Sequence, residues 1–157
     1  MKTLYNLSII SILCFISTNC GGSKTDYNFA SAKVAYLSSE GMETLSVRSS
    51  GVGENESQAR YQAERLAFEN LFFRGIAGSP YSKPLVGINE TEELNKNASY
   101  FNSFFNNRMQ TFILSSYQST PKQKSKGTVY LTMDLKINTR SLKKDLETNG
   151  IIRKFGL

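Results

Sequence analysis

The sequence predicts an α+β domain: a small antiparallel or mixed sheet with a long helix and a C-terminal helix packed on one face. Two patterns carry this prediction. Apolar and polar residues alternate from Val129 to Ile137, the period of a half-buried strand, and apolar residues recur at helical spacing between Glu56 and Arg74. A chain of 157 residues with 39% hydrophobic and 20% charged residues suits one globular domain with its own core.

The first 19 residues have the features of a secretory signal peptide. Lys2 supplies a positive charge, and a mainly apolar run follows from Leu4 to Ile16. This run is shorter than the roughly 20 residues that a membrane-spanning helix needs. We therefore expect residues 1–19 to be removed on export.

A cysteine at position 20 follows this run, with Gly21 and Gly22 behind it. The segment Ile16–Cys20 resembles the looser lipobox of Bacteroidetes-like bacterial lipoproteins. The resemblance implies that Cys20 becomes the N-terminus and carries acyl chains, which hold the protein on a membrane. We expect the periplasmic face of the outer membrane. The alternative is an ordinary thiol at Cys20.

Residues 20–41 are rich in Ser, Gly and Lys, so we expect a tether there and a single domain over residues 42–157. The short apolar patch Val34–Leu37 leaves open an edge strand instead. From Glu43 to Val52, apolar residues alternate with polar ones, which predicts a half-buried strand.

A long helix is expected from about Glu56 to Arg74. Asn55, with Gln58 three residues on, has the spacing of a capping box. Phe68 and Phe72 lie on the opposite side from the sheet, so a second layer should cover them. The residues expected to face the sheet are Ala59, Ala63, Leu66, Ala67 and Phe73.

Two inserts follow this helix. The acidic stretch from Asn89 to Asn97 is expected to be a solvated loop. An aromatic helical insert is expected at about residues 98–110, because its apolar residues repeat at helical spacing, and we expect it to pack on Phe68 and Phe72. These residues are Phe101, Phe104, Phe105 and Met109.

The C-terminal third predicts an antiparallel hairpin and a helix. Thr111–Gln118 and Gly127–Ile137 have strand periodicity and are joined by a polar turn. Asn138 is placed to cap a helix over Thr139–Thr148.

A strand that ends at Gly51-Val52-Gly53, followed by alanines at four-residue spacing, resembles LPP20-like lipoproteins and related N-terminal domains of flagellar-assembly proteins. The alanines are Ala59, Ala63 and Ala67. The resemblance covers about residues 43–75 and, more loosely, 110–148. It implies a small envelope-facing domain that binds or assembles rather than catalyses.

The chain has no His, which argues against zinc enzymes and Ser-His-Asp hydrolases. No recognisable motif joins a Ser to a Lys, so we assign no catalytic residue, metal or cofactor. We therefore expect a non-catalytic module that contacts an envelope protein. Nucleic acid is disfavoured as a partner because export removes the chain from it.

Positive charge is concentrated near the C-terminus. The net charge is +6, and residues 120–157 carry nine Lys and Arg against three Asp and Glu. As an alternative function, a basic patch there would bind an acidic envelope polymer or lipid. A solvated surface is the simpler interpretation. The patch would comprise Lys122, Lys124, Lys126, Arg140, Lys143 and Lys144.

Overall fold

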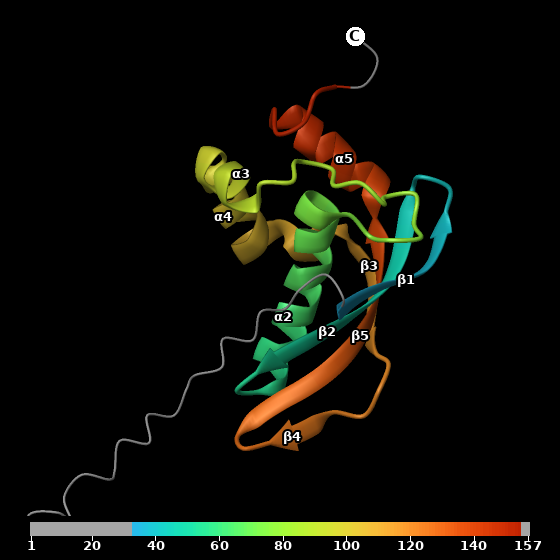
Figure 1. Cartoon of the computed structure of the whole chain (residues 1–157), viewed down its shortest axis with the longest axis vertical. Coiled ribbons are helices and arrows are strands. Elements are labelled where there is room, and N and C mark those ends of the chain that lie inside the picture. The colour runs from blue at the N-terminus through green and yellow to red at the C-terminus, as the bar shows by residue number, and fades with distance from the viewer. Residues whose placement is uncertain (1–32, 155–157) are drawn as a thin grey trace, which may run out of the picture.

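The computed structural model describes residues 33–154, which form an antiparallel sheet with helices packed on one face (Figure 1). Four strands lie in the order β1-β2-β5-β3, and the short strand β4 also pairs with β5. This arrangement confirms the predicted α+β class. The strands are β1 Val34–Glu40, β2 Thr44–Gly53, β3 Ile113–Gln118, β4 Gln123–Ser125 and β5 Thr128–Asn138.

Alternating side chains on β2 and β5 build the core side of the sheet. The apolar residues of β5 from Val129 to Ile137 that were predicted to share one face are all buried. Leu45 lies opposite Ile137, and Val47 lies opposite Leu135, so the two strands present one apolar surface.

The predicted tether overlaps β1, so the tether prediction was wrong for Val34–Glu40. This segment pairs antiparallel with β2, with Val34 opposite Ser49, and Val34 and Tyr36 pack against the core. The edge-strand alternative is therefore confirmed. Residues 20–32 of the predicted tether lie outside the described residues.

Helix α2 (Glu56–Glu69) crosses the sheet where β2 carries glycine. The Asn55 side chain accepts a hydrogen bond from the Gln58 amide at 2.9 Å, as expected of the cap, while the Gln58 side chain accepts one from the preceding loop. A Cβ atom at Gly51 would lie 2.0 Å from the Ala59 carbonyl oxygen. Only glycine therefore permits so close an approach of helix to sheet.

The long helix continues to Arg74 as predicted, but its last turn, Asn70–Arg74, is a π-helical turn. The Gly75 amide donates to the Asn70 carbonyl at 2.7 Å. The Asn70 side-chain nitrogen donates to the Leu66 carbonyl at 2.8 Å, whereas its oxygen has no hydrogen-bond partner among the described residues. Only one of the two polar side-chain atoms of this buried amide therefore has a hydrogen-bond partner among the described residues.

The aromatic insert packs on α2, as predicted. The Phe104 ring centroid lies 5.3 Å from that of Phe68 and 5.1 Å from that of Phe72, and both pairs meet edge to face. This second layer explains why the long helix is apolar on two sides. The insert comprises α4 (Ala98–Ser103), a π-helical turn (Phe104–Arg108) and a 3-10 turn (Met109–Phe112).

Two short helices complete the helical layer. Helix α3 (Glu90–Lys96) occupies the insert that was expected to be a loop, so that prediction was wrong. The Asn89 side chain caps it, and acidic residues in its first turn interact favourably with the helix dipole. Helix α5 (Thr139–Thr148) covers the predicted residues, and the Asn138 side chain caps it by accepting a backbone hydrogen bond at 2.9 Å.

Candidate functional site

The face of the sheet that points away from α2 carries a row of side chains across four strands. Ala35 on β1, Arg48 on β2, Asp134 on β5 and Tyr117 on β3 are successive register partners. Ala35, Arg48 and Tyr117 are exposed, and Tyr117 is 59% exposed. No described helix covers this row, which we call the open face.

An ion pair lies at the centre of the open face. Arg48 Nε donates to Asp134 Oδ1 and Arg48 Nη2 donates to Asp134 Oδ2, each at 2.7 Å. The Arg48 side chain is 47% exposed, whereas that of Asp134 is 6% exposed. The hydrogen bonds from Arg48 hold the pKa of Asp134 below its usual range, although burial acts in the opposite direction.

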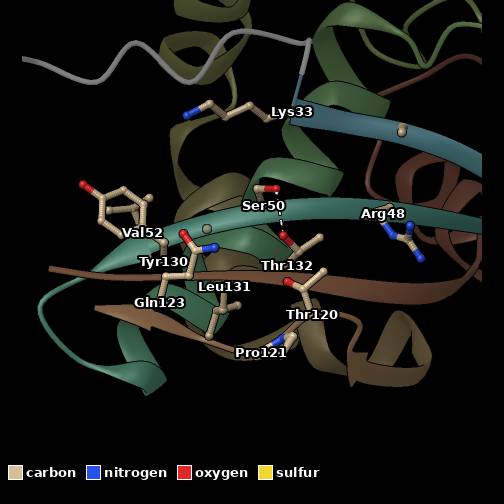
Figure 2. A pocket seen from close by; sticks show the side chains of 12 residues that line it. Lys33, Arg48, Ser50, Val52, Thr120, Pro121, Gln123, Tyr130, Leu131 and Thr132 are labelled. Atoms are coloured by element: carbon tan, nitrogen blue, oxygen red, sulfur yellow. Dashed lines mark hydrogen bonds between the residues drawn. The ribbon is translucent and has the colours of Figure 1, made fainter. Parts of the chain in front are cut away.

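A hollow of about 480 Å³ lies beside this pair (Figure 2). Ser50 and Thr132, on neighbouring strands, share a hydrogen bond between their hydroxyl oxygens at 3.2 Å. Uncharged polar residues and apolar residues contribute equally to the lining, and its cations are Lys33 and Arg48. The full lining is Lys33, Ala35, Arg48, Ser50, Gly51, Val52, Thr120, Pro121, Gln123, Tyr130, Leu131 and Thr132.

A second, smaller hollow of about 180 Å³ adjoins the other side of the Arg48–Asp134 pair. Leu37 and Tyr117 line it, and Leu37 is 41% exposed. Lys136 also lines it and is held by Glu40, with 2.6 Å between the ammonium nitrogen and a carboxylate oxygen. The open face thus combines exposed apolar groups with fixed ion pairs.

These groups can bind a partner through hydrogen bonds, a planar guanidinium and apolar contact. Within residues 33–154, no three acidic or Cys side chains are grouped so as to hold a metal ion. None of the helices described there is long and apolar enough to cross a bilayer.

The three lysines predicted between β3 and β5 lie around β4. Lys122 is bound to Glu56 at the start of α2, with 2.8 Å between nitrogen and oxygen. Lys124 and Lys126 are exposed, and neither forms an ion pair with an acid in the described part of the chain. Lys126 takes a positive φ of 47° in the turn before β5.

The three cations predicted on α5 lie at the other end of β5. Arg140 is bound to Glu43 at 2.7 Å, Lys144 is exposed, and Lys143 lines a separate hollow. Because the 11 residues of β5 span about 36 Å, the six cations cannot form the single patch that the sequence suggested. Their closeness in sequence misled the prediction, because an extended strand separates them.

Cys20, the predicted lipidation site, lies outside the described residues. The prediction also missed the Arg48–Asp134 pair. The available signal was that both residues occupy outward positions of predicted strands. Their pairing depends on the register of β2 against β5, which the sequence does not supply.

The fold and the open face define only a broad class, a small α+β domain with one exposed sheet surface. No protein-family model, curated protein or solved structure matches this chain.

Proposed function

We propose that this chain is a lipid-anchored, non-catalytic module of the bacterial cell envelope that contacts a protein partner through its open face. The anchor is an acylated Cys20, and the expected location is the periplasmic face of the outer membrane. The observation that carries the partner-binding role is the exposed row around the Arg48–Asp134 pair.

The composition of the open face supports this role. Tyr and Arg are enriched in protein interfaces, and both Arg48 of the ion pair and the neighbouring Tyr117 are exposed. Leu37 adds an exposed apolar side chain on the same surface. Side chains fixed by hydrogen bonds lose little conformational freedom when a partner binds.

The edges of the sheet favour contact through its face. The register of β1 shifts between Tyr36 and Ser38, and that of β3 shifts between Ile113 and Ser115. Such bulges hinder the addition of another strand at an edge. A partner would therefore meet side chains rather than a free backbone edge.

The anchor is tested by mass spectrometry and membrane fractionation of the native protein. Acyl chains on residue 20 and recovery with membranes are expected. Cys20→Ser should abolish acylation of the chain. An unmodified thiol at this position in membrane-free material would refute the anchor.

The open face is tested by site-specific photo-crosslinking in cells. A photoreactive amino acid replaces Tyr117, and the control carries it at Thr148, which is exposed at the end of α5. A discrete crosslinked product is expected only at Tyr117, and Arg48→Ala should weaken it. Products of equal yield from both positions would argue against a specific face.

A further inference from the structure

Two adjoining hollows lie among the loop after α2, helix α3 and the turn after α5. They have volumes of about 280 and 590 Å³, and both are lined by Leu85 and Ile152. We call this region the amphipathic groove. It is separate from the open face, with which it shares no lining residue.

The walls of the groove are fixed by hydrogen bonds. The Leu85 amide donates to the Leu71 carbonyl at 3.0 Å. The Tyr81 hydroxyl donates to the Met42 carbonyl at 2.6 Å, which ties the loop to the turn between β1 and β2. The Ile151 amide donates to the Leu146 carbonyl at 2.9 Å. These hydrogen bonds hold the walls of the groove in place.

The lining joins apolar side chains with cations. Lys83 and Lys143 line one hollow, and Lys96 and Arg153 line the other. Glu93 is the single acid among the described lining residues. The apolar members are Met42, Pro80, Pro84, Leu85, Val86, Ile151 and Ile152.

Most of this positive charge is uncompensated. Lys83, Lys96 and Arg153 are exposed, and none forms an ion pair with an acid among residues 33–154. Of the cations that the sequence singled out, Lys122 and Arg140 are bound to glutamates, whereas Lys124 and Lys126 form no ion pair among residues 33–154 and do not line the groove. The charge thus favours an anionic ligand at the groove.

The apolar part of the lining distinguishes between anionic ligands. A hydrated acidic polymer gains little from Leu85 and Ile152, whereas a lipid offers both a negative headgroup and hydrocarbon. Met42, at the rim, is 50% exposed and adds an accessible apolar side chain to the groove.

We propose that the amphipathic groove binds anionic phospholipid at a membrane surface, with the cations on the headgroups and the apolar side chains against the start of the acyl chains. The proposed anchor is compatible with this contact. Thirteen residues from Cys20 to Lys33 reach at most about 45 Å, which exceeds the roughly 23 Å length of β1 that separates Lys33 from the groove end. This comparison of lengths assumes that Cys20 is anchored in the membrane, as proposed above. The binding test below does not depend on the anchor, because it uses chains that carry Cys20→Ser.

The test is co-sedimentation of the full chain carrying Cys20→Ser with two kinds of vesicle. One kind is phosphatidylcholine alone, and the other is an equal mixture of phosphatidylcholine and phosphatidylglycerol. The apolar segment Leu4–Ile16 is the same in every variant, so differences between variants in the preference for anionic vesicles report on the groove. A clear preference for the anionic vesicles is expected for the parent chain.

The decisive comparison is between two double variants that each remove two exposed lysines. Lys83→Gln with Lys96→Gln should lower the preference for anionic vesicles about 30-fold, since each lysine near an anionic surface contributes about fivefold. Lys124→Gln with Lys126→Gln should leave the preference nearly unchanged. An equal loss in both variants, or no preference in the parent chain, would overturn the proposal.

A third arm separates lipid from polymer. Met42→Ser changes an exposed side chain and should weaken vesicle binding without affecting the fold, as checked by circular dichroism. Soluble polyglutamate should compete weakly. If polyglutamate displaces the chain fully and Met42→Ser has no effect, the groove recognises acidic polymers and the lipid assignment is wrong.

Discussion

Replacing Gly51 by Ala tests how closely α2 approaches the sheet. The added Cβ would lie 2.0 Å from the carbonyl oxygen of Ala59 and 2.5 Å from the amide nitrogen of Ala63. Both are backbone atoms on successive turns of α2, so no side-chain rotation can relieve the contacts. Gly51 does not have a positive φ, and alanine is therefore compatible with its backbone conformation.

The loss in the free energy of unfolding can be worked out from the distance that α2 must move to relieve these contacts. Protein Cβ atoms essentially never approach other atoms closer than 3.0 Å, so α2 must move away from β2 by about 1 Å. A gap of this size forfeits about a quarter to a half of each van der Waals attraction across it. Overpacking usually lowers the free energy of unfolding by about 1–3 kcal/mol. Because the atoms in contact here belong to the backbone of α2, we expect a loss of about 3 kcal/mol for Gly51→Ala.

Urea unfolding followed by circular dichroism measures this cost, with Cys20→Ser in all variants so that acyl chains play no part. The control is Gly41→Ala, which has no atom within 4 Å but a positive φ of 56°, and should cost about 1 kcal/mol. If Gly51→Ala costs no more than Gly41→Ala, α2 does not lie against β2 in the way described.

The remaining predictions concern the ion pair and the aromatic layer. Arg48→Ala should destabilise the protein more than Asp134→Ala, because a lone carboxylate stays buried whereas a lone guanidinium reaches water; urea midpoints in the opposite order would contradict this. The lowered pKa of Asp134 gives stability that is present above about pH 3.9 and is lost as the pH falls through the folded-state pKa. Asp134→Asn should therefore reduce the fall in urea midpoint between neutral pH and about pH 2, and an unchanged fall would count against the pair. Phe72→Ala should cost about 3–5 kcal/mol in urea unfolding, whereas the exposed Leu114→Ala should cost less than about 0.5 kcal/mol; similar losses would refute a tightly packed layer.

Local patterns predicted most of the elements. The alternation along β5 and the caps at Asn55 and Asn138 depend on neighbours a few residues away, so a single sequence is enough to recognise them. Helix α3 was missed because it has no fully buried side chain and no apolar stripe, although Leu94 packs partly buried against the core. Its stability comes from the Asn89 cap, the helix dipole and an ion pair between Arg74 and Glu90.

The candidate sites depended on contacts between distant parts of the chain. Arg48 and Asp134 are 86 residues apart, and their pairing follows from strand register. The amphipathic groove joins the loop after α2 to the C-terminal turn, with Leu85 and Ile152 as common walls. The predicted basic patch failed for the converse reason, because residues near in sequence were separated by the length of β5.

The sequence by itself determined the fold class, most helix and strand positions and the assignment of the aromatic insert to the core. The periodicity of apolar residues and the helix caps involve residues only a few positions apart. Only the tertiary structure decided which cations form ion pairs, which face of the sheet is exposed, and where apolar side chains and cations together line the amphipathic groove. The physical reason is that local structure depends on the nearest turns of the chain, whereas a binding surface depends on the register and packing of elements far apart in sequence.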